Sequence, residues 1–137
     1  MSDINVQIFT PSRELFKGEV SELLLPSFDG EVGVLPGHKD FTGLLGTGVL
    51  KIVQNGDDYW FVVSSGVYEV QNGEVTVLAE VGESAKEVDI EAAQVQEKEL
   101  EEVLKDQNQY SDEFADLRVR YERAQARREV HRRTNLN

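Results

Sequence analysis

The side chains that could serve metal or acid–base chemistry are few in this sequence. It contains two histidines, His38 and His131, and no cysteine. Zinc sites are built mainly from cysteine and histidine, so the composition excludes a site of that kind, and we expect no bound metal. His38 directly follows the turn-forming dipeptide Pro36-Gly37, a position that favours a structural or docking role over that of a catalytic base.

Nucleophilic and phosphate-binding motifs are also missing from the sequence. Ser12, Ser64 and Ser65 lie in or beside expected strands, and none is enclosed in a G-x-S-x-G nucleophile motif. The glycines between residues 30 and 48 do not spell a P-loop, because no Gly-Lys-Ser or Gly-Lys-Thr follows them. We therefore expect no catalytic residues, no cofactor and no independent enzymatic activity.

Arginine is the most concentrated charged residue, since residues 118–137 carry seven arginines and only two glutamates. The chain as a whole has a net charge of −12, which disfavours nucleic-acid binding. Arg120, Arg123 and Arg127 fall on one face of an expected helix, where they could pair with an acidic partner. The alternative is a solvated face that offsets the helix dipole, and Asp116 is well placed to pair with Arg120.

The first part of the chain is expected to consist of β-strands. Apolar and β-branched residues alternate in short segments, and Asn55-Gly56 and Asn72-Gly73 are strong hairpin signals. The segments expected to be strands include 3–9, 20–25, 49–53, 59–63, 67–70 and 75–78. Eight or more short strands within about 80 residues indicate an antiparallel β-sandwich or a barrel-like sheet.

Residues 26–48 contain six glycines and two prolines among apolar residues. This composition predicts tight turns at Asp29-Gly30 and Pro36-Gly37 within a sheet rather than a flexible linker. Because the segment offers few ionisable groups, we interpret it as a docking surface for a partner and not as a reactive centre.

From Asp89 onward the sequence contains neither proline nor glycine, and helix-forming residues dominate. Asp89 and Ser111 are suitable N-caps for two helices separated by polar residues 106–109, a pattern that predicts an antiparallel helical hairpin. The second helix carries a main apolar stripe and a weaker one on its opposite side, so we expect it to face two neighbours. The main stripe is Phe114, Leu117, Tyr121 and Ala124, and the weaker one is Val119, Ala126 and Val130.

Five stretches, together with the helical tail, point to a known family by their order and spacing. They are TPSRELFKGEV (10–20), LLLPSFDGEVGVLPGH (23–38), LLGTGVLKI (44–52), SSGVYEV (64–70) and EVTVLAE (74–80). The chain resembles the ε subunit of bacterial and chloroplast F-type ATP synthases, the equivalent of the mitochondrial δ subunit. Ser27 and Ser65 stand where that family usually has glycine, a difference that concerns turn geometry rather than the fold.

The resemblance implies an N-terminal antiparallel β-sandwich of about ten strands over residues 1–84 and a regulatory two-helix hairpin over residues 85–137. It also implies a place on the rotor, where the sandwich docks onto the γ subunit and the ring of c subunits. The residues that would form this contact are Glu31, Gly33, Pro36 and His38.

The resemblance further implies that the helices extend along γ and inhibit ATP hydrolysis, with Arg120, Arg123 and Arg127 contacting the catalytic α/β ring. Some family members bind ATP through an Ile/Val-Asp-x-x-Arg-Ala motif and arginines of the second helix. Asp89, Arg123 and Arg127 match that set, but Ala92 replaces the arginine of the motif. Since a charged phosphate partner is lost, we expect weak ATP binding or none.

We interpret the chain as a non-catalytic rotor subunit that couples proton translocation to ATP synthesis. No segment approaches the ~20 apolar residues needed to cross a bilayer, and the N-terminus MSDINVQIF lacks an export or organelle signal. We expect a peripheral protein, attached through its complex to the cytoplasmic face of a bacterial plasma membrane or, in a plastid, to the thylakoid. The alternative function is a free-standing β-sandwich adaptor whose arginine-rich helix binds an acidic protein.

Overall fold

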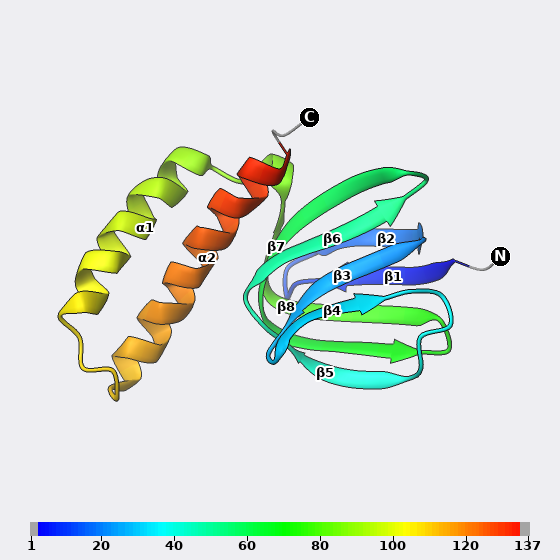
Figure 1. Cartoon of the computed structure of the whole chain (residues 1–137), viewed down its shortest axis with the longest axis horizontal. Coiled ribbons are helices and arrows are strands. Elements are labelled where there is room, and N and C mark those ends of the chain that lie inside the picture. The colour runs from blue at the N-terminus through cyan, green and yellow to red at the C-terminus, as the bar shows by residue number, and fades with distance from the viewer. Residues whose placement is uncertain (1–2, 135–137) are drawn as a thin grey trace.

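The computed structural model describes residues 3–134, which form eight strands followed by two helices (Figure 1). The strands are β1 (Ile4–Phe9), β2 (Glu14–Val20), β3 (Glu22–Ser27), β4 (Gly30–Val34), β5 (Phe41–Leu45), β6 (Gly48–Gln54), β7 (Asp57–Gln71) and β8 (Glu74–Ser84). A short 3₁₀ helix, η1 (Ala85–Glu87), leads into α1 (Ile90–Lys105) and α2 (Asp112–Thr134). The extreme ends of the two expected domains, residues 1–2 and 135–137, lie outside the described residues.

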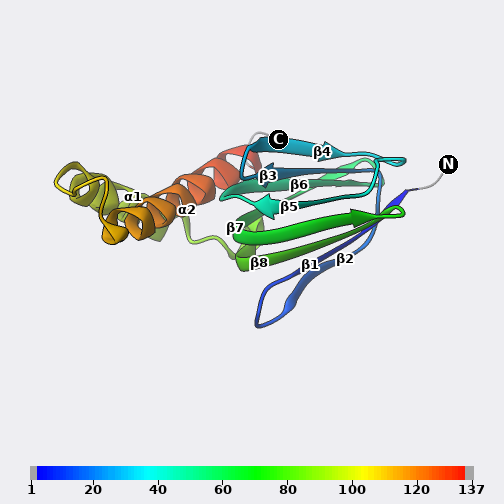
Figure 2. The same cartoon turned by 90° about the horizontal axis from the view of Figure 1, so that it is seen from below.

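The strands form a sandwich because the long strand β7 contributes to both of its layers (Figure 2). Its first part, Asp57–Val63, pairs with β6, and its second part, Gly66–Val70, pairs with β5. The strand changes direction at Ser65 and Gly66, whose φ angles are 59° and 132°. A Cβ on Gly66 would lie 1.9 Å from the carbonyl oxygen of Leu78, so only glycine fits at this bend.

The predicted sandwich and helical hairpin are confirmed, with two differences of detail. The described residues contain eight strands instead of about ten, and two of the expected strands, 59–63 and 67–70, are parts of the single strand β7. The sandwich is also not purely antiparallel, since β1 runs parallel to β8. Parallel pairing of the first and last strands needs a long connection, and the whole of the intervening sandwich supplies it.

The sandwich core is a single cluster of buried aliphatic side chains, with Phe61 and Tyr68 as its large aromatic members. Inward positions alternate with outward ones along β1 and β8, as expected for strands with one buried face. A Cβ on Gly43 would lie 2.6 Å from the hydroxyl oxygen of Tyr68, so glycine at this position makes room for the buried ring.

The helices begin where their capping residues predict. The Asp89 carboxylate accepts a hydrogen bond from the Ala92 amide at 3.0 Å, and the Ser111 hydroxyl accepts one from the Phe114 amide at 3.1 Å. Helix α2 lies between α1 and the sandwich (Figure 1), so the prediction that it has two neighbours is confirmed. Its weaker stripe faces the sheet, where Ala126 and Val130 pack with Val62.

Candidate functional site

An exposed apolar row crosses the outer face of the sandwich. Leu78 of β8 is paired with Phe9 of β1 and with Val67 of β7, and Val67 is paired with Leu44 of β5. Directly paired residues project from the same face of a sheet, so these four side chains, here called the apolar row, lie in line. Leu44, Leu78 and Val67 are 57%, 48% and 40% exposed. Contiguous exposed apolar residues are typical of surfaces that bind other proteins, so the apolar row is a candidate docking surface.

Sequence reasoning missed the apolar row. Val67 and Leu78 face each other across the β7–β8 hairpin, but Phe9 and Leu44 come from strands that lie far from it in the chain. Single exposed leucines or valines are also normal on protein surfaces. Only the pairing register brings them together. The available signal was weak: Leu44, Val67 and Leu78 occupy positions that alternation assigns to the outer face, yet they are apolar.

The predicted docking residues lie on and after the edge strand β4. Glu31 and Gly33 belong to β4 and are exposed, whereas Pro36 and His38 belong to the following turn and are half-buried. The His38 amide closes this turn by donating to the Leu35 carbonyl at 3.0 Å. The segment therefore presents a structured surface at one edge of the sandwich, and its contact with a rotor stays a prediction.

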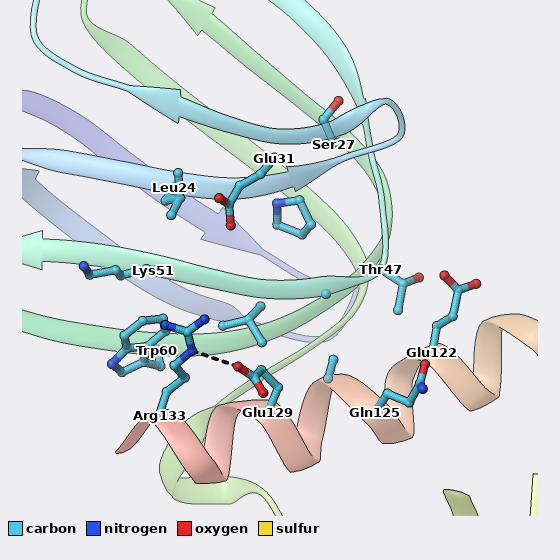
Figure 3. A pocket seen from close by; sticks show the side chains of 15 residues that line it. Leu24, Ser27, Glu31, Thr47, Lys51, Trp60, Glu122, Gln125, Glu129 and Arg133 are labelled. Atoms are coloured by element: carbon cyan, nitrogen blue, oxygen red, sulfur yellow. Dashed lines mark hydrogen bonds and ion pairs between the residues drawn. The ribbon is translucent and has the colours of Figure 1, made fainter. Parts of the chain in front are cut away.

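A groove of about 600 Å³ runs between the sandwich and α2 (Figure 3). Glu31 lines it from β4, and Glu122 and Glu129 line it from α2. The indole of Trp60 also lines the groove, with the Lys51 ammonium and the Arg133 guanidinium 5.4 and 5.8 Å from its ring centroid. The following residues complete the lining: Leu24, Pro26, Ser27, Gly30, Thr47, Gly48, Val49, Gln125 and Ala126. Since both sandwich and hairpin form the groove, it exists only while α2 lies against the sheet.

The C-terminal turns of α2 are strongly ion-paired. Hydrogen bonds from Arg132 and Arg133 lower the pKa of the Glu129 carboxyl to about 2. Arg133 contacts Glu129 at 2.8 Å. The predicted pair of Arg120 with Asp116, nearer the start of the helix, is also present at 3.4 Å. These pairs lie within one helix and are largely exposed, so each contributes only a few tenths of a kcal/mol, by the usual magnitude of about 0.2–0.5 kcal/mol.

The three arginines that were predicted to act together are divided by the structure. Arg123 donates from Nε to the hydroxyl of Ser64 at 2.8 Å, and Arg127 is ion-paired with Glu83. Both therefore face the sandwich. Arg120 has an exposed side chain, with 55% of its surface accessible, and is paired with Asp116 of the same helix. In this conformation only Arg120 is available to a partner among the three.

The depression beside Asp89 does not include the two arginines of the nucleotide motif among its lining residues. The carboxylate of Asp89 caps α1, and the depression beside it is lined by Glu91, Ala92 and Glu99 but by neither Arg123 nor Arg127. That depression carries three carboxylates in all, an environment that repels phosphate. Nucleotide binding at these residues stays a prediction of low affinity.

Residues 3–134 contain neither a metal-binding cluster nor a membrane-spanning helix. No group of three or more histidine, aspartate or glutamate side chains is placed to hold a metal ion there. None of the helices described is both long and apolar enough to cross a membrane.

The sequence of this chain is similar to those of known proteins. Residues 3–85 match the family model of the β-sandwich domain of the ATP synthase delta/epsilon chain. The ATP synthase epsilon chain of Pelotomaculum thermopropionicum is 39% identical over 99 residues, which cover 72% of this chain and 74% of that protein. The chloroplastic ATP synthase epsilon chain of Pelargonium hortorum is 36% identical over 93 residues, or 66% of this chain and 69% of that one.

Solved structures show the same fold. A chain in the mitochondrial ATP synthase of Euglena gracilis, determined as an assembly of OSCP, F1 and c-ring, superposes with a TM-score of 0.79. It is 19% identical and covers 92% of this chain and 79% of its own length. A central-stalk and c-ring structure from Tetrahymena thermophila gives a TM-score of 0.54 at 18% identity, with 64% of this chain and 70% of that one covered. On the sequence matches, this chain belongs to the ε-chain family of ATP synthases.

Proposed function

We propose that the chain is a non-catalytic subunit of the rotor of an F-type ATP synthase, where it helps couple proton translocation to ATP synthesis. The apolar row carries this proposal, because a subunit that transmits torque needs a permanent contact. Permanent interfaces are more apolar than transient ones. The family membership favours this role over that of a free-standing adaptor. The complex would place the chain at the cytoplasmic face of a bacterial membrane, or at a thylakoid.

The apolar row is the surface proposed to bind γ, and β4 with its following turn is the surface proposed to meet the c-ring. The row offers side chains from four strands on a rigid sheet, which suits tight and invariant docking. The β4 edge offers the Glu31 carboxylate, which has room to accept hydrogen bonds from a polar loop. The two surfaces come from different strands, so both contacts can be made at once.

The helical hairpin is proposed to regulate ATP hydrolysis. Among the described residues α2 is the helix that packs on β6 and β7, and the buried side chains of this seam are Val62, Ala126 and Val130, with Val49, Trp60, Ala85 and Val88 partly buried around them. An apolar contact this small leaves the hairpin able to detach while the sandwich stays folded. Once detached, it would expose Arg123 and Arg127 beside Arg120, and the three cations would contact the catalytic α/β ring and inhibit it.

Docking through the apolar row is tested by Leu78→Asp in a co-purification and binding assay with γ. The substitution places a carboxylate in the centre of the proposed interface, and the loss of an apolar contact there is worth about 1.5–3 kcal/mol. Affinity for γ should therefore fall at least tenfold. Val95→Asp is the matched control, because Val95 is an apolar residue of α1 that is 57% exposed and distant from the row. Equal binding by wild type and Leu78→Asp would refute this docking surface.

A further inference from the structure

The ion pair between Arg127 and Glu83 connects the helical hairpin to the sandwich. Arg127 of α2 is bonded to Glu83 of β8, and both side chains are only 21% exposed. The same guanidinium lies 3.4 Å from the side-chain oxygen of Gln96 on α1. A single arginine thus connects the sandwich, the first helix and the second helix. The Asp116–Arg120 pair, by contrast, joins residues of one helix at 70% and 55% exposure.

The register of the sheet explains why Glu83 reaches α2. Glu83 is paired directly with Val62, so both side chains project from the same face. Val62 is fully buried and packs against Ala126 and Val130 of α2. Glu83 therefore lies beside the apolar seam, one residue before β8 ends and the connection to the helices begins.

A second arginine makes a parallel contact one turn earlier in α2. Arg123 donates to the Ser64 hydroxyl, and Ser64 lies 2.9 Å from the hydroxyl of Thr47. Ser64 is the buried polar residue of the described core, with no exposed surface. The sandwich therefore supplies hydrogen-bond acceptors to both arginines, and Glu83 supplies the only negative charge that is bonded to either of them in residues 3–134.

We propose that Glu83 acts as an internal ligand for α2. Its carboxylate binds the guanidinium of Arg127 and so holds the hairpin against the sandwich without any bound nucleotide or other anion. A partly desolvated guanidinium needs an anionic partner, and a carboxylate fixed on the sheet provides one permanently. An external anion has to displace a tethered group whose effective concentration is in the millimolar range or higher. Hairpin release is thus insensitive to low concentrations of free anions.

The test removes the Glu83 carboxylate by mutation and then supplies a free carboxylate, acetate, in the buffer. Glu83→Ala in the full-length chain should raise the undocked fraction of the hairpin about tenfold, measured by hydrogen exchange of the α2 amides and by Trp60 emission. Trp60 is the only tryptophan of the chain and lies under α2, next to Arg133. Sodium acetate should restore docking of Glu83→Ala better than sodium chloride at the same ionic strength.

The matched control is Glu97→Ala. Glu97 pairs with Arg128 at 2.9 Å but connects α1 to α2 and not to the sandwich, so its removal should leave Trp60 emission unchanged. Glu83→Gln keeps the size of the side chain but removes its charge. We expect its hairpin to undock as in Glu83→Ala, and we expect acetate not to restore docking. Circular dichroism checks that each variant keeps its strands.

Two results would contradict the proposal that Glu83 holds the hairpin. One is wild-type docking in both Glu83 variants. The other is a loosened Glu83→Ala hairpin whose docking acetate restores no better than chloride does. These measurements use the isolated chain, so their failure is separate from any failure of the proposed γ contact. The effect of Glu83 on hydrolysis by the assembled complex does rest on the proposed function.

Discussion

Truncation of Val130 should release the hairpin without unfolding the sandwich. Val130 is fully buried, and its cluster contains side chains of α2, of the connection and of β6 and β7, but none from the sandwich core. Val130→Ala removes two methyl groups, at about 0.8 kcal/mol each, and leaves a cavity that adds to the loss. The docked state should lose about 1.5–2.5 kcal/mol, which shifts the docking equilibrium at least tenfold.

Hydrogen exchange followed by mass spectrometry measures this shift directly. Amides of α2 should exchange at least tenfold faster in Val130→Ala, while amides of β1 and β8 keep their wild-type protection. Val95→Ala is the control, because Val95 is 57% exposed and its truncation should change neither region. The reasoning is refuted if β1, β8 and α2 all lose protection together, since hairpin and sandwich would then unfold as one unit. It is also refuted if α2 protection is unchanged.

Three further predictions concern the bend, the end of α2 and nucleotides. Ser65→Gly should raise the thermal stability, since Ser65 has φ 59° and glycine adopts that conformation without strain; calorimetry checks the midpoint. The pKa of Glu129 is depressed to about 2, so its pairs with Arg132 and Arg133 stabilise the helix end above pH 4.5. That stabilisation should disappear as the pH falls through about 2, and helicity in Glu129→Gln should lack this acid transition. Titration calorimetry of the isolated chain should show no micromolar ATP binding, because Ala92 offers no cation to phosphate.

Local sequence features predicted the local structure well. Asp89 and Ser111 signalled their helix starts because a capping bond involves residues only three apart. The Asp116–Arg120 pair followed from helical spacing in the same way. The two stripes of α2 also predicted two neighbours, because helical periodicity alone determines which residues share a face.

Contacts that depend on strand register were beyond sequence reasoning. The pairing of Leu44, Val67 and Leu78 depends on the alignment of three separate strands, and a shift by one residue would turn each side chain to the other face. Likewise, nothing local indicated that Glu83 would neutralise Arg127, which is 44 residues away. The prediction gave two strands, 59–63 and 67–70, and assigned no structure to the residues between them, whereas the β7–β8 register continues across Ser65 and Gly66.

The ATP hydrolysis rate of the assembled complex tests the central claim, that a docked hairpin is the inactive form of an inhibitor. Val130→Ala frees the hairpin but keeps all three arginines, whereas Arg120→Ala removes one proposed contact and leaves Arg123 and Arg127 bonded to the sandwich. We predict opposite changes: slower hydrolysis with Val130→Ala and faster hydrolysis with Arg120→Ala. Wild-type rates for both variants in fully assembled complexes, or faster hydrolysis with Val130→Ala, would contradict it.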